Sequence, residues 1–207
     1  MTVAISDSWK RMEDWLAEHA PATHAALTPP ADSARIAEVE RAIGRPLLRP
    51  LVASPARHDG FLDWRTSLLP GLYRLLSARE IVAEWRSLTG CYDRCAVDEA
   101  GDEVDDDFMR IGSSALLYGH PQVIPIARDM CGSDLLVDHR PVGDRGRVHT
   151  AEAVEGFVRG SHEMWTSLPV LMERVVASLE TGRPLDGYTP VVDGEQRLCW
   201  EFGPRSL

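Results

Sequence analysis

The sequence predicts an α+β domain: a largely antiparallel, curved sheet packed by helices from the N-terminal, middle and C-terminal parts of the chain. Helical periodicity of apolar residues near both ends, and short apolar runs bounded by turn residues between them, predict this class. The order is helices, strands, one helix among strands and a closing helix, which lacks the regular alternation of a parallel α/β sheet. With 207 residues, 44% of them hydrophobic, the chain is long enough to build one such core.

Two helices are expected near the N-terminus. The first is predicted from a cap at Ser6, Asp7 or Ser8 to about Ala20, because four apolar residues fall on one helical face: Trp9, Met12, Leu16 and Ala20. A proline-containing linker is expected over residues 21–30. The second helix is predicted over 33–43, with Asp32 as its cap and Gly44 as its stop. Its apolar face is formed by Ile36, Val39 and Ile43.

The middle of the chain is expected to be irregular over residues 46–61, which hold three prolines and the turn-forming pair Asp59–Gly60. Residues 68–76 are typical of two strand fragments around a Pro-Gly turn. Ser77 and Glu80 have the spacing of a capping box, in which each side chain binds a backbone N–H group near the helix start. The helix that they open is predicted to turn four residues inward: Ile81, Val82, Trp85 and Leu88.

A β-hairpin is predicted over Val123–Asp138. Two apolar runs, 123–127 and 135–137, flank a polar connection that contains Asp129, Gly132 and Asp134. Residues 146–149 and 156–160 are expected to be further strands.

The closing helix is predicted from a Ser167 cap to Leu179, packed on the sheet and stopped by Gly182. Its apolar face is formed by Leu168, Leu171, Val175 and Leu179. Residues 198–202 are a candidate edge strand.

Charge and composition limit the function classes. The formal net charge of −10 makes nucleic acid an improbable direct partner, because phosphate binding needs clustered cations. No apolar run approaches the roughly 20 residues that span a bilayer, so no membrane partner is expected. The N-terminus has no basic region followed by an apolar stretch, which favours a cytoplasmic protein. Free thiols are expected at the four cysteines: Cys91, Cys95, Cys131 and Cys199.

An acidic run is the most conspicuous local feature. It places seven carboxylates in residues 98–107: Asp98, Glu99, Asp102, Glu103, Asp105, Asp106 and Asp107. The pattern fails as a calcium loop, since Ala100 and Glu103 occupy positions that need a ligand and a glycine. A solvated loop and a partner-binding patch both remain open, with metal binding as a third reading. Trp64, beside Arg65, is a candidate interface aromatic, with a core position as the alternative.

Motifs for catalysis or metal binding are incomplete. Cys91 and Cys95 have no second ligand pair at zinc spacing, and the pair His162–Glu163 lacks a second histidine because Thr166 stands there. No nucleophile elbow or phosphate-binding loop is present. We therefore expect no metal, no cofactor and no catalytic residues. A site assembled from dispersed residues, as in a hydrolase, remains the alternative.

The ordered set of segments resembles the SUKH superfamily, Smi/Knr group. The similarity begins with the Trp-containing first helix (9–16), the helix that ends in Ile-Gly (36–44) and an Asp-Gly turn (57–60). It continues with a strand pair (69–77) that leads into a helix with Glu80 and Trp85, the hairpin (125–138) and the closing helix (167–182). The resemblance implies one SUKH-like domain over residues 1–182, with residues 183–207 as an extension.

The resemblance also implies a function. Members of this family bind proteins and have no known chemistry; bacterial members resemble immunity proteins that neutralise a cognate toxin, and fungal relatives are linked to cell-wall synthesis. It implies a protein partner, here expected to be a basic toxin domain held through the acidic run and Trp64. Asp129, Gly132 and Asp134 match the family's turn. A regulatory scaffold without a toxin is the alternative, and the sequence leaves the oligomeric state open.

Overall fold

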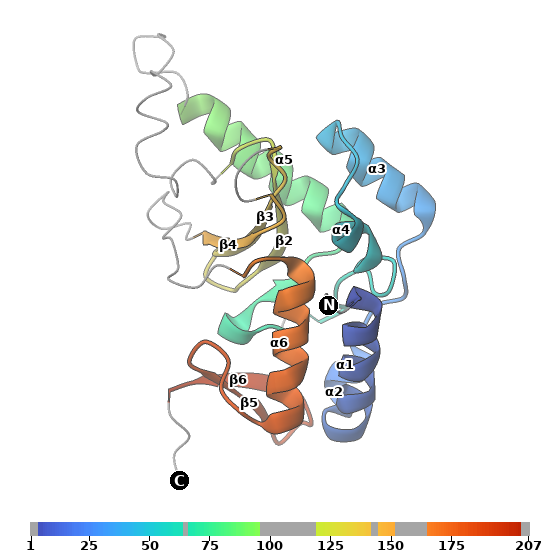
Figure 1. Ribbon diagram of the computed structural model, residues 1–207, viewed down its shortest axis with the longest axis vertical. Helices are drawn as coiled ribbons and strands as arrows, with labels where there is room; N and C mark the ends of the chain where they lie inside the picture. The colour runs from blue at the N-terminus through green and yellow to red at the C-terminus, as the bar shows by residue number, and fades with distance from the viewer. Residues whose placement is uncertain (1–3, 64–65, 96–118, 142–144, 152–164, 204–207) are drawn as a thin grey trace.

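The computed structural model describes residues 4–63, 66–95, 119–141, 145–151 and 165–203 (Figure 1). Helices and strands are mixed, and four strands form an antiparallel sheet in the order β1-β2-β3-β4. These strands are Arg74–Leu75, Val123–Arg128, Asp134–Asp138 and Val148–Ala151. The predicted α+β class is confirmed.

Helix α1 (Ile5–His19) begins earlier than expected. Its N-cap is Ala4, which makes no side-chain capping bond, and none of residues 6–8 is the cap. Ile5 is buried in the core, so its packing stabilises a first turn that lacks a polar cap. The predicted apolar face is fully buried: Trp9, Met12, Leu16 and Ala20.

Two short helices replace segments that were expected to be irregular. Helix α2 (Pro21–Ala25) occupies the start of the predicted linker, and helix α4 (Arg49–Ala53) lies within residues 46–61. In each a proline stands in the first turn, where its missing N–H costs no helical hydrogen bond. The buried Thr23 of α2 accepts a hydrogen bond from the backbone N–H of Leu198 at 2.8 Å, so tertiary contacts hold this short helix.

Two further helices begin and end at the predicted signals. Helix α3 (Ser33–Ile43) is capped by Asp32, which accepts from the N–H of Arg35 at 2.7 Å, and it ends at Gly44. Helix α6 (Leu168–Thr181) is capped by Ser167 and ends at Gly182. Both glycines have positive φ, the left-handed conformation that favours glycine at a helix end. Helix α5 spans Ala78–Cys95.

The predicted hairpin is confirmed as strands β2 and β3, which pair antiparallel with a register shift between Pro125 and Ala127. Every residue of β3 is buried, so this strand is covered on both of its faces. β4 begins at Val148, later than residue 146, and the predicted strand over residues 156–160 lies outside the described residues. The short strand β1 follows a tight turn, η1 (Pro70–Leu72), as the Pro-Gly pair predicted.

The closing helix α6 packs along α1, and the two lie side by side in Figure 1. We expected α6 to pack on the sheet. Its most extensive contact is with α1, and Leu168 at its start borders a small cavity together with Ile126 of β2. The helix on the sheet is α5, which contacts β2. Apolar faces on both α1 and α6 explain the pairing, because each helix buries the stripe of the other.

The C-terminal residues form a second sheet. The candidate edge strand is present as β6 (Leu198–Phe202), and it pairs antiparallel with β5 (Tyr188–Val192), a strand that the sequence did not predict. Leu198 and Trp200 are buried in the main core. Among the described helices, none combines the length and the apolar character needed to cross a bilayer.

Candidate binding groove

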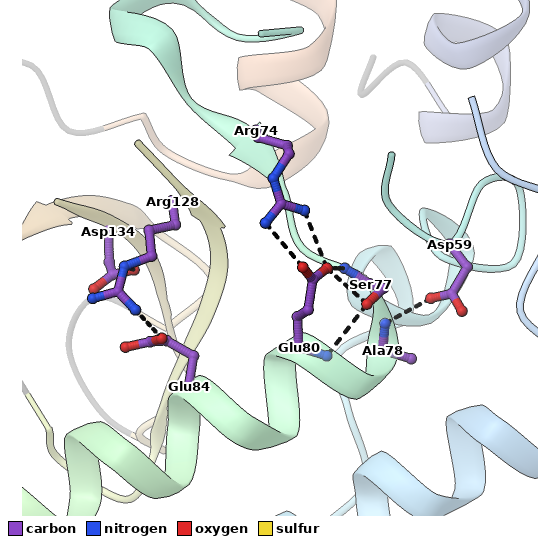
Figure 2. A network of polar contacts seen from close by, with 8 residues as sticks. All are labelled: Asp59, Arg74, Ser77, Ala78, Glu80, Glu84, Arg128 and Asp134. Atoms are coloured by element: carbon purple, nitrogen blue, oxygen red, sulfur yellow. Dashed lines mark hydrogen bonds and ion pairs between the residues drawn. The ribbon is translucent and has the colours of Figure 1, made fainter. Parts of the chain in front are cut away.

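The start of α5 is fixed by a polar network (Figure 2). Glu80 accepts hydrogen bonds from the backbone N–H and the hydroxyl of Ser77 at 2.8 and 2.7 Å, and the N–H of Glu80 donates to that hydroxyl at 3.3 Å. The predicted capping box is therefore confirmed. Arg74 of β1 adds a bidentate pair at 2.9 and 3.1 Å, and these bonds lower the pKa of Glu80 against the effect of its burial.

Asp59 connects the same helix end to α3. One carboxylate oxygen accepts from the backbone N–H of Ala78 at 2.6 Å, and the other lies 3.2 Å from the Arg35 guanidinium. The next residue, Gly60, has a φ of 82°, and a Cβ there would lie 2.7 Å from the backbone nitrogen of Ser77. The predicted Asp-Gly turn thus brings the chain against the helix start at a distance that excludes a side chain.

Helices α3 and α5 contact each other and leave an open groove of about 700 Å³ between them. On each helix the lining follows the i, i+3, i+4, i+7 spacing of one face. From α5 the lining residues are Arg79, Val82, Ala83 and Arg86, together with Ala78; from α3 they are Arg35, Glu38, Val39 and Ala42, together with Arg41. On α5, Val82 and Ala83 lie between Arg79 and Arg86, so this side of the groove has an apolar middle with cationic ends.

The charge of this groove is opposite to that of the chain. Four arginines line it against one glutamate, although the formal net charge of the protein is −10. Arg35 is paired with Asp59. Within the part of the chain that the structure describes, Arg41, Arg79 and Arg86 are exposed and have no ion-pair or hydrogen-bond partner. A second cavity of about 500 Å³ shares Arg35 and is lined also by Asp59, Ser77 and Glu80.

A different polar cluster connects α5 to the hairpin. Arg128 of β2 pairs with Glu84 of α5, and its Nε lies 3.7 Å from the carboxylate of Asp134 (Figure 2). Asp134 is fully buried, and neither of its carboxylate oxygens has a hydrogen-bond partner in the described part of the chain. Burial raises the pKa of Asp134 to about 7, opposed by Arg128 and reinforced by the negative charges of Glu84 and Asp129.

The residues of the family-motif turn have different roles. Asp129 accepts from the N–H groups of Cys131 and Ser133 at 2.8 and 2.7 Å, and Gly132 has a φ of 89°. Asp134 was expected to bind backbone N–H groups of this turn; instead it begins β3, and its carboxylate accepts no hydrogen bond from the described residues. Asp134 pairs with Ala151 of β4 inside the sheet.

The expected partner-binding residues are not placed by this structure. The acidic run 98–107 and Trp64 lie outside the described residues. The described cysteine side chains, Cys131 and Cys199, are free thiols. Among the described residues, no three histidine, cysteine or carboxylate side chains are grouped closely enough to hold a metal ion.

Sequence reasoning missed the groove arginines. The signal was present as two pairs of arginines: Arg79 and Arg86 are seven residues apart, and Arg35 and Arg41 are six residues apart. Each pair alone is typical of an ordinary exposed helix, and contact between the two helices makes them one surface.

Comparison of the sequence with known proteins found no relative: no protein-family model matches the chain, and no curated protein matches it significantly.

Proposed function

We propose that this chain is a non-enzymatic protein-binding module whose α3/α5 groove receives a segment of a protein partner. The observation that carries the proposal is the open groove itself, with an apolar middle and three arginines that have no counter-charge among the described residues. Arginine is among the residue types that are enriched in protein interfaces. A partner that covers this surface would bury the apolar part and supply acceptors for the guanidinium groups.

The resemblance to the SUKH superfamily supports a more specific class, an immunity protein that neutralises a cognate toxin by binding it. Such an activity requires a complementary surface on a stable scaffold, and the capping box and Asp59 hold the groove helices in that way. A regulatory scaffold uses the same surface with a different partner. A polymorphic-toxin gene beside the coding sequence favours immunity over the scaffold.

A basic toxin domain remains our prediction for the partner's overall charge. A net charge of −10 speeds the encounter with a cationic protein, and the acidic run adds to this long-range attraction. Neutralising Asp105, Asp106 and Asp107 together is expected to slow association at low salt more than it changes dissociation. Unchanged association rates would remove the acidic run from the binding surface.

Site-specific cross-linking tests the groove. A photoreactive amino acid is placed in the full chain at Ala83 on α5 or at Glu38 on α3, both exposed groove residues, and the protein is irradiated in cells of its source. Glu18, exposed on α1, is the control position. We expect one partner protein to be cross-linked from both groove positions and not from Glu18. The proposal is overturned if neither groove position yields an adduct, or if Glu18 yields the same adduct equally.

A further inference from the structure

We infer that the α3/α5 groove binds an acidic amphipathic segment, in which carboxylates flank apolar side chains two helical turns apart. This inference rests on the proposed function, because it specifies the chemistry of the partner segment in the same groove. It also separates two electrostatic roles: the net charge of the whole chain favours a cationic partner at long range, whereas the groove selects acidic residues at contact.

The spacing of the α5 arginines determines what fits. Arg79 and Arg86 are seven residues apart, which is about 10 Å along a helix, and Val82 and Ala83 lie between them. A partner helix with carboxylates at i and i+7, and leucine-sized residues at i+3 and i+4, repeats this spacing with the opposite charge. Its apolar residues would cover Val82 and Ala83 while each carboxylate meets one guanidinium.

The α3 side of the groove favours the same ligand. Ala42 is half-buried and gives this wall an accessible apolar side chain, whereas Val39, at 2% exposure, lies beneath it in the core. Arg41 adds a third guanidinium that has no partner among the described residues, whereas Arg35 is held by Asp59 and is expected to contribute less. A guanidinium has a planar fork of donors that matches a carboxylate in a bidentate geometry. The free forks are thus suited to the carboxylate of glutamate or aspartate.

A peptide fits these observations better than a nucleic acid does. Phosphate backbones are bound by extended basic surfaces, and the net charge of −10 repels them outside this groove. The apolar middle of the groove also has no counterpart on a phosphate backbone. The acidic charge must therefore come on a chain that carries apolar side chains as well.

Fluorescence anisotropy with designed peptides tests the inference. The probe is a labelled helical peptide with Glu at i and i+7 and Leu at i+3 and i+4, and the matched control replaces each Glu by Gln. We expect the Glu peptide to bind about tenfold more tightly than the Gln peptide at low salt, from two partly exposed ion pairs, and to lose this advantage at high salt. Equal affinity of the two peptides overturns the inference.

Protein variants in which groove arginines are replaced by glutamate provide a second test of the inference. Arg79→Glu with Arg86→Glu is expected to reverse the preference, so that a peptide with Lys in place of Glu now binds more tightly. Arg49→Glu with Arg183→Glu is the matched control, because it changes the net charge equally at two exposed residues that do not line the groove. All four arginines are exposed, and unchanged thermal unfolding shows that the variants are folded. An equal loss of Glu-peptide affinity in the control pair would contradict the inference.

The remaining outcomes separate the inference from the proposed function. A single-stranded oligodeoxynucleotide that displaces the Glu peptide at comparable concentration indicates a general polyanion site and overturns the acidic-segment inference. If the groove cross-links to a partner are kept in the variant with both groove arginines replaced, the groove is a protein-binding surface but its arginines do not select the partner. If the cross-links are absent altogether, the proposed function fails.

Discussion

A carboxylate oxygen of Asp59 accepts a hydrogen bond from the backbone N–H of Ala78, the first residue of α5, at 2.6 Å. Its other oxygen lies 3.2 Å from a guanidinium nitrogen of Arg35 on α3, so one buried carboxylate ties the two helices of the groove together. The geometry of the groove therefore depends on a residue in the turn before it and not on its lining alone.

Asp59→Ala is expected to lower the free energy of unfolding by about 1–3 kcal/mol, because it leaves a buried N–H without an acceptor and releases Arg35. Urea denaturation measures the change. Asp32→Ala, at the exposed cap of α3, is the control and is expected to cost about 1 kcal/mol. Equal losses would mean that Asp59 acts as an ordinary cap and does not couple the helices.

Ser77→Ala removes the hydroxyl that both donates to Glu80 and accepts from its N–H. We expect a loss of about 0.5–2 kcal/mol in the free energy of unfolding, as for other helix caps. Ser167→Ala is the comparison: its capping contact to the N–H of Val170 is long, at 3.4 Å, so the loss should be smaller. Thermal and urea unfolding of the two variants should rank them in this order, and the reverse order would contradict the role given to the capping box.

Asp134→Asn is expected to stabilise the protein above pH 7. The pKa of Asp134 is raised from 3.8 to about 7 in the folded state, so the folded protein binds a proton that the unfolded chain has released. Stability is therefore lost as pH rises from about 4 to 7, by about 2–4 kcal/mol.

The stability difference between Asp134→Asn and the parent isolates this residue. We expect the advantage of the variant to grow between pH 5 and pH 8, and urea denaturation over this range would show it. A difference that is constant with pH would mean that the carboxylate is ionised in the folded protein and held by Arg128.

His139 should produce the opposite dependence. Its Nε2 accepts a hydrogen bond from the N–H of Leu48 at 3.1 Å, and burial, with Arg145 and Arg45 nearby, lowers the pKa of His139 to about 4. The unfolded chain takes up a proton near pH 6.5 while the folded protein does not. Stability is therefore lost as pH falls from about 6.5 to 4, by about 2–3 kcal/mol.

His139→Gln keeps an acceptor at this position and removes the titration. Its unfolding free energy is expected to depend less on pH than that of the parent below pH 6.5, with a loss of about 1 kcal/mol near pH 7 from the altered bond. Circular dichroism during urea titration measures both quantities. An identical pH dependence in parent and variant would exclude His139 as the titrating group.

Local signals in the sequence determined much of the fold. Asp32 and Gly44 bound α3, Ser167 and Gly182 bound α6, and the capping box opens α5, because each of these signals acts on backbone groups a few residues away. The hairpin was predictable for the same reason: its apolar runs and its polar turn are adjacent in the chain.

Contacts between distant residues decided the rest. Thr23 of α2 accepts a hydrogen bond from the distant Leu198, α6 packs on α1, and Asp134 pairs with β4. None of these three contacts is announced by a signal in the neighbouring sequence. The groove has the same origin: Arg79 and Arg86 lie on one face of α5, and they join Arg35 and Arg41 of α3 in a single cationic surface because α3 packs on α5. The sequence by itself determined where α3, α6 and the hairpin lie and where α5 begins, because capping and turn signals act locally. The short helices α2 and α4, the strand β5 and the pairing of element faces depend on the burial of side chains far apart in the chain, so the tertiary structure decided them.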